Sequence, residues 1–181
     1  MSKKVILIII ILALAVTLSI SVGSYGSSEP SQFVTYTDET NGFSIEHPDD
    51  WHINTPKDPP ELKVSIWEKE VGLNPVGLMV GKYEVSGYSL EDFSEFRKNF
   101  LSNKAKDYIS IYTEELTIDG IPALKHIYTE TVGSTTYKLV NVCLVKDEIG
   151  WILSFNSPQK SFDSYKPIFD TSFNSFRLLE K

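Results

Sequence analysis

The segment Tyr137–Val145 has the sequence YKLVNVCLV, and its apolar residues fall on both faces of a strand. Because side chains alternate across a strand, Leu139 and Cys143 would face one side, and Val140 and Val142 the other. A strand that is apolar on both faces belongs in the middle of a sheet that is covered on each side. The sequence therefore predicts a central strand here, with a covering layer above and below it.

Shorter segments around this strand have apolar residues at every second position. They contain Phe43 and Ile45; Leu62, Val64 and Ile66; Val76, Leu78 and Val80; and Ile121, Ala123 and Ile127. Alternation of this kind is typical of half-buried strands. The dipeptides Asn41-Gly42 and Asp119-Gly120 lie between such segments, and both favour tight hairpins. We therefore expect an antiparallel sheet.

Two segments with helical spacing would supply the covering layers. In the first, Ser89 caps the helix and Asp92 follows three residues later, which is the pattern of a capping box. Its apolar residues are expected on one stripe, namely Leu90, Phe93, Phe96, Phe100 and Leu101.

The second helix is expected to begin at Ser157-Pro158, a cap followed by proline at the first helical position. Pro167 should kink or restart this helix, because proline lacks the backbone N–H. A short strand over 175–178 would then return to the sheet. The whole pattern predicts an α+β domain.

The N-terminus resembles a targeting segment. Lys3 and Lys4 precede Val5–Val22, an eighteen-residue apolar run, and a small polar stretch follows. This layout predicts a secretory signal or a membrane anchor over 1–23, a flexible linker over 24–32 and one domain over 33–181. The lysines would keep the N-terminus in the cytoplasm and place the domain outside it.

Composition excludes several classes of function. The formal net charge is −7 and no basic cluster is present, which argues against a nucleic-acid partner. The sequence contains neither a Walker loop nor a dinucleotide-binding glycine pattern, so nucleotide binding is not expected. Cys143 is the single cysteine, hence no disulfide forms within the chain, and its place in the central strand predicts a small buried side chain.

A candidate metal site lies in the segment that contains His47, Asp49, Asp50 and His52. Carboxylate and imidazole groups at this density could hold calcium or another divalent cation. The spacing matches neither an EF-hand nor the helical pairs of zinc enzymes. Acidic residues beside a Pro-Asp turn are also common for backbone reasons, so a purely structural role stays open.

Two further features bear on function. His126 could serve as the base of a hydrolase, but the sequence has no nucleophile elbow, and a partly exposed cross-strand histidine is the better interpretation. Trp51 would anchor a proline-rich surface loop. Trp67, Tyr83 and Tyr88 lie outside the expected apolar stripes and are candidates for a recognition surface.

Several motifs together resemble the PsbP family, the extrinsic proteins of photosystem II, and its relatives that include a Ran-GTPase-binding branch. Gly42–Trp51 (GFSIEHPDDW) is similar to the family's G-F-x-I-x-x-P-x-x-W start. The helix start at Gly87–Phe93, the turn at Asp119–Ala123 and the ending over 162–178 agree with the family in order.

This resemblance implies an α/β/α sandwich around an antiparallel sheet and a non-catalytic role. It favours an extracytoplasmic binding module that associates with a membrane protein or complex. The alternatives are a divalent-cation-binding protein of calcium type, and a role in the oxygen-evolving complex of photosystem II if the host is photosynthetic, since photosynthetic members help their complex to retain calcium and chloride.

Overall fold

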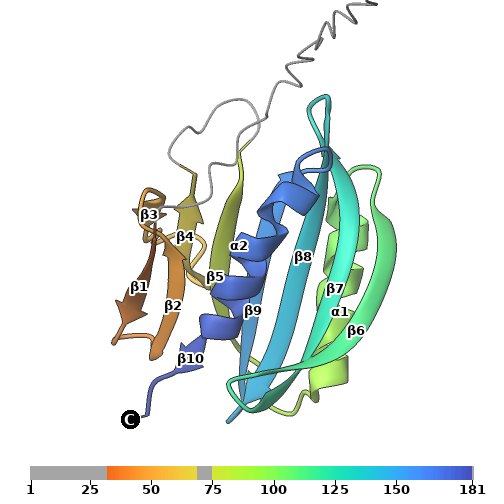
Figure 1. Cartoon of the computed structure of the whole chain (residues 1–181). Coiled ribbons are helices and arrows are strands. Elements are labelled where there is room, and N and C mark those ends of the chain that lie inside the picture. The colour runs from red at the N-terminus through yellow and green to blue at the C-terminus, as the bar shows by residue number, and fades with distance from the viewer. Residues whose placement is uncertain (1–31, 69–74, 181) are drawn as a thin grey trace, which may run out of the picture.

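The computed structural model describes residues 32–68 and 75–180. Its main element is a seven-stranded sheet in the order β3-β4-β5-β9-β8-β7-β6 (Figure 1). In chain order these strands are β3 (His52–Asn54), β4 (Leu62–Trp67), β5 (Gly77–Glu84), β6 (Ile109–Ile118), β7 (Ile121–Val132), β8 (Thr135–Lys146) and β9 (Ile149–Pro158). Every neighbouring pair is antiparallel.

A second sheet of three strands packs beside the first, in the order β1-β2-β10. It consists of β1 (Phe33–Asp38), β2 (Phe43–Pro48) and β10 (Arg177–Leu178). The sequence pattern predicted β2 and β10 but not β1, and it assigned them to a single sheet. Hydrophobic periodicity gives the faces of a strand and not its partner, so the division into two sheets was not predicted.

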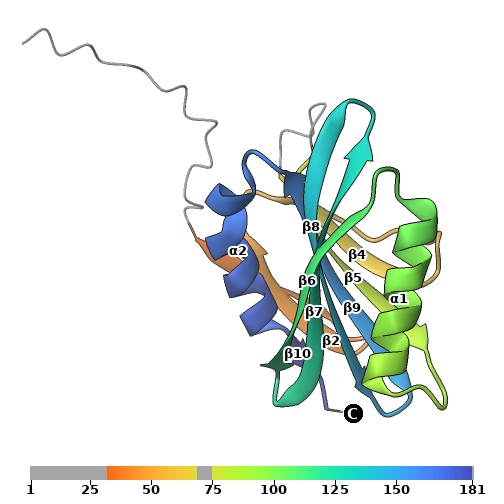
Figure 2. The same cartoon turned by 90° about the vertical axis from the view of Figure 1, so that its right-hand side faces the viewer.

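Two helices cover opposite faces of the seven-stranded sheet (Figure 2). Helix α1 (Leu90–Lys104) packs on β7 and β8, and helix α2 (Phe162–Ser175) packs on β9 and β2. The α+β class is thereby confirmed.

The expected central strand is β8, which pairs with β7 on one side and β9 on the other. Val140 and Val142 belong to the main core beneath α2. Leu139 and Cys143 belong to two smaller apolar clusters on the opposite, α1 face. Both faces of the strand are thus buried, as the alternation predicted, and burial raises the pKa of the Cys143 thiol to about 12.

Helix α1 begins with the predicted capping box. The Asp92 backbone N–H donates to the Ser89 hydroxyl at 3.1 Å, and the Ser89 N–H donates to the Asp92 carboxylate at 3.3 Å. The expected apolar stripe is only partly correct, because Phe93 and Leu101 are buried whereas Phe96 and Phe100 are exposed.

Helix α2 begins later than the Ser157-Pro158 pair predicted. Ser157 and Pro158 are the last residues of β9, where they pair with Lys138 and Tyr137 of β8. A proline is tolerated at a strand end because no further ladder bond is needed there. The helix cap is Ser161, and Pro167 lies inside a continuous helix rather than at a break.

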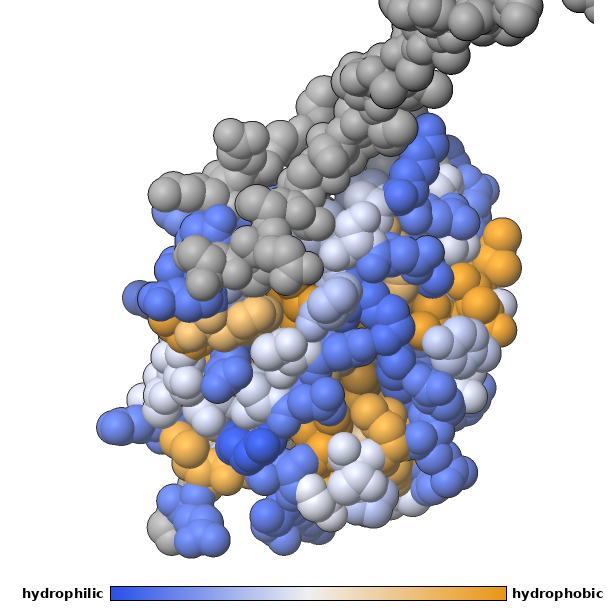
Figure 3. All heavy atoms as spheres, viewed as in Figure 1, coloured by the Kyte–Doolittle hydropathy of each residue, from blue (hydrophilic) through white to orange (hydrophobic). Residues whose placement is uncertain are grey.

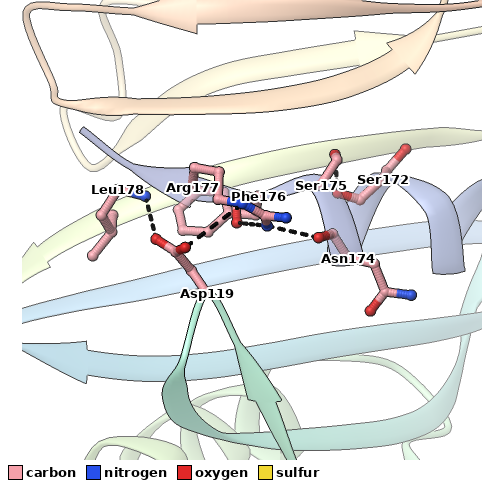
Figure 4. Close-up of polar contacts among 7 residues, drawn as sticks. All are labelled: Asp119, Ser172, Asn174, Ser175, Phe176, Arg177 and Leu178. Atoms are coloured by element: carbon pink, nitrogen blue, oxygen red, sulfur yellow. Dashed lines mark hydrogen bonds and ion pairs between the residues drawn. The ribbon is translucent and has the colours of Figure 1, made fainter.

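The Asp119 carboxylate, in the β6–β7 turn, contacts the C-terminal strand β10 (Figure 4). The Leu178 N–H donates to Asp119 Oδ2 at 3.0 Å, and the Arg177 guanidinium lies 3.6 Å from Asp119 Oδ1. Asp119 has a φ of 53°, a left-handed conformation that aspartate adopts more readily than most residues. One turn residue therefore joins the two sheets.

The loop that follows β2 contains the short edge strand β3, and Trp51 is buried there as the expected anchor. The targeting segment and nearly all of the linker lie outside the described residues. Within residues 32–68 and 75–180, no helix has the length and apolar character needed to cross a membrane.

Candidate functional site

The structure separates the residues of the candidate metal site. His47 is buried at the end of β2, where its Nδ1 lies 2.7 Å from the Pro48 carbonyl oxygen. Burial lowers the pKa of this imidazole, and the Pro48 hydrogen bond and the Asp49 charge only partly oppose that effect. Asp49, Asp50 and His52 are exposed.

These four residues do not form a ligand set in this structure. No group of three or more histidine, cysteine or acidic side chains in the described ranges is placed to hold a metal ion. The acidic residues of the β6–β7 hairpin have other partners, since Glu114 pairs with Lys125 at 2.8 Å and Asp119 binds β10.

His126 lies in a buried polar network beneath α1, where only 2% of its surface is exposed. The expected partial exposure is therefore wrong. Its Nε2 lies 2.7 Å from the Tyr108 hydroxyl, and its Nδ1 lies 3.2 Å from the Thr113 hydroxyl. Its place in an alternating strand suggested partial exposure, but the Tyr108 hydroxyl, between α1 and β6, lies against the imidazole ring.

The network continues across β7, β8 and β9. Asn141 donates to the Tyr128 hydroxyl at 3.3 Å and accepts from Ser154 at 3.1 Å. Arg97 Nε of α1 donates to Asn141 Oδ1 at 3.4 Å, the side-chain oxygen that also accepts from Ser154. These contacts join α1 to three strands of the sheet through polar groups rather than through apolar packing.

This network is better suited to structure than to proton transfer. Burial, reinforced by the charge of Lys98, lowers the pKa of His126, although the Tyr112 carbonyl and Glu95 oppose the shift. Burial also raises the pKa of Tyr128. A general base needs a ring nitrogen that can reach a substrate. Both nitrogens of His126 are already occupied by hydroxyl groups.

A cleft of about 550 Å³ opens at the end of the sheet where the β7–β8 turn meets the start of α2. Tyr165 donates to both carboxylate oxygens of Glu68, at 2.8 and 2.9 Å, and closes one wall. The lining is rich in hydroxyl and amide groups, including Ser134, Thr136, Gln159 and Ser161. The charged residues of the lining are Glu68, which accepts from Tyr165, and the exposed Lys160.

Exposed aromatic side chains gather on α1 and on the residue just before its cap, and we call them the α1 aromatic surface: Tyr88, Phe96 and Phe100. Their exposed fractions are 47%, 52% and 45%. The Tyr88 and Phe96 rings meet edge to face at 6.3 Å, and the Arg97 guanidinium lies 5.4 Å from the Phe100 ring centre. Tyr88 was among the predicted recognition residues, whereas the two phenylalanines were assigned to the core.

The first half of β6 is a second exposed apolar region. Ile109, Ile111 and Tyr112 are 62%, 47% and 45% exposed. Strand β6 is the last strand of its sheet, and Figure 3 shows apolar side chains gathered at that edge of the molecule. The sequence analysis did not single out these residues. The sequence did contain a signal for this region, because residues 109–113 (ISIYT) combine isoleucine and tyrosine without a charged residue.

No protein-family model matches the chain, and no curated protein matches it. Solved structures do. Cyanobacterial PsbP (CyanoP) from Synechocystis sp. PCC 6803 has a TM-score of 0.65 at 20% identity, over 87% of this chain and 98% of that one.

Two other structures share the fold at lower identity. LpqN, involved in cell envelope biogenesis of Mycobacterium tuberculosis, has a TM-score of 0.59 at 10% identity, over 82% of this chain and 91% of that one. A mutant of the protein Mog1 has a TM-score of 0.61 at 9% identity, over 83% of this chain and 97% of that one. These likenesses show the fold, which is PsbP-like. Membership of the PsbP family stays a prediction.

Proposed function

We propose that this chain is a non-enzymatic, extracytoplasmic binding module that docks on a membrane protein or complex through the α1 aromatic surface. The observation that carries the proposal is the exposure of Phe96 and Phe100 on α1, with the exposed Tyr88 ring against Phe96. Aromatic residues are enriched at protein interfaces, because they bury a large area while losing little conformational freedom.

The contacts that hold α1 on the sheet suit a docking role. The capping box fixes the start of the helix, and the Arg97–Asn141 hydrogen bond fixes its rotation on the sheet. Phe93 and Leu101 are buried against that sheet, so the exposed rings stand on a rigid base. Binding then costs this chain less conformational entropy than it would if the rings stood on a mobile loop.

The location outside the cytoplasm rests on the sequence of the first 23 residues and gains support from the fold. CyanoP and the envelope protein LpqN share this architecture. A role in photosystem II is not part of the proposal, because the likeness to CyanoP extends only to the fold.

Co-purification of the full chain from detergent-solubilised membranes tests the proposal. We expect a stable partner with the wild type and its loss in a Phe96→Ser/Phe100→Ser variant. Ile53→Ser is the matched control, since Ile53 is 44% exposed on β3 at the opposite edge of the sheet. A wild-type chain that always elutes alone, or a double variant that keeps the partner, would contradict the proposal.

Cation binding at His47, Asp49, Asp50 and His52 stays a prediction, with its own measurement. Calorimetry of the full chain with calcium, manganese and zinc would give saturable heat that an Asp49→Asn/Asp50→Asn variant loses. Heats no larger than dilution for all three ions would dispose of the hypothesis. His47→Ala is a poor test, because the burial of His47 makes a loss of stability the expected result.

A further inference from the structure

The two edges of the seven-stranded sheet differ greatly. Strand β3 contains three residues and lies between Pro48 and Pro56, which cannot donate to an added strand. Strand β6 contains ten residues and forms the other edge. Natural proteins usually blunt an open edge with prolines, charges or a short strand, and only β3 follows that rule fully.

The exposed part of β6 has two halves of different chemistry. From Ile109 to Thr113 the strand is uncharged, and Ile109, Ile111 and Tyr112 are exposed. A β-bulge lies between Ser110 and Tyr112. Glu114 and Glu115 follow and are exposed as well. The edge therefore offers an apolar stretch beside an acidic one.

We propose that β6 receives an extended segment of another protein as an additional strand of the sheet. The outer backbone groups of β6 face no strand of the described sheet. An added strand would pair with them and cover the exposed isoleucine side chains, as in other cases of strand addition. This inference goes beyond the proposed function, because it concerns the β6 edge and not the α1 aromatic surface.

Charge identifies the occupant as a segment with alternating apolar and basic residues. Glu114 already pairs with Lys125 of β7, so a lysine or arginine side chain would lie near Glu115, where a cross-strand pair of opposite charge is favourable. A second copy of this chain is the poorer occupant. Pairing of β6 with the β6 of a second copy would bring Glu114 and Glu115 of both copies into one interface. The chain already has a formal net charge of −7.

The test follows backbone amide exchange of the full chain in detergent, with a ten-residue peptide of alternating lysine and valine as the probe. We expect slower exchange over 109–118. The peptide of alternating glutamate and valine, and the lysine peptide with N-methylated valines, should give no protection. Ile111→Lys should raise the apparent Kd of the lysine–valine peptide about tenfold or more, because the new lysine repels the lysines of the peptide. Phe96→Ser/Phe100→Ser should leave this Kd unchanged.

Three outcomes overturn the inference. Equal protection by the N-methylated peptide would show side-chain docking without strand pairing. No protection with any peptide would show that the edge is closed to addition. Protection that depends on protein concentration alone would make a second copy the occupant. The proposed function fails separately, because it depends on co-purification through Phe96 and Phe100 and not on the peptide.

Discussion

Buried polar residues decide how α1 lies on the sheet. Ser94 is buried and Phe96 is exposed, the reverse of what hydrophobicity alone predicts. The physical reason lies beneath the helix, where Arg97 reaches Asn141. Asn141 Oδ1 also accepts from Ser154, and the guanidinium adds a second donor at the rotation that the helix adopts.

The first prediction concerns pH. Burial favours the neutral forms of His47 and His126, so their folded-state pKa values lie below the ordinary value of 6.5. The unfolded chain then binds more protons in the window below pH 6.5. The free energy of unfolding should therefore be greatest above this pH and fall as the pH decreases, by at most about 1.4 kcal/mol per pH unit for each histidine.

Urea denaturation between pH 5 and 8 measures this slope. His126→Gln should reduce this slope, because the variant lacks one of the two buried imidazoles. An unchanged slope in the His126 variant would show that this histidine is not held neutral by the fold.

At the scale of elements, local signals predicted how α1 begins but not how α2 begins. A capping box is complete within four residues, so Ser89 and Asp92 were recognisable from sequence. Ser157-Pro158 carries a different helix-start signal, a cap followed by proline, yet β8 lies alongside and extends β9 through both residues. Ladder hydrogen bonds between distant segments override a local helix-start preference.

Removal of the α1 cap gives the second prediction. Ser89→Ala should lower the free energy of unfolding by about 1 kcal/mol, because the first-turn N–H groups lose their acceptor. Ser102→Ala is the matched control, since Ser102 is an exposed serine near the other end of the same helix. Equal losses in chemical denaturation of the two variants would show that the capping box does not stabilise the fold.

At the scale of the whole molecule, one main core joins the two sheets and α2. Phe43 of β2, Trp151 of β9 and Phe176 pack their rings together at 5.6 to 5.9 Å between centres. Asp119 adds the polar link from the β6–β7 turn to β10. Residues far apart in the chain thus hold the C-terminus in place.

This link predicts a difference between two aspartates with the same backbone conformation. Asp119 and Asp147 have φ values of 53° and 51°, so alanine is strained at both sites. Asp119→Ala should cost about 1 kcal/mol more than Asp147→Ala in urea denaturation, because it also removes the acceptor of the Leu178 N–H. The exposed Arg177 ion pair should add little. Equal costs would show that the link is not stabilising.

The location of the molecule gives the last prediction. Protease added to intact spheroplasts should degrade the domain of the full chain, because the predicted targeting segment would place it outside the cytoplasm. A chain without residues 1–23 should remain protected inside the cell. Protection of the full chain would contradict an extracytoplasmic location.

The sequence by itself determined the class of fold, the two-sided burial of β8, the cap of α1 and the resemblance to PsbP proteins. These features depend on periodicity or on residues a few positions apart. The tertiary structure alone decided the second sheet, the start of α2, the burial of His126 and the exposure of Phe96 and of β6. Each of these depends on which distant segments pack together, and the hydrophobic pattern of a single segment does not contain that information.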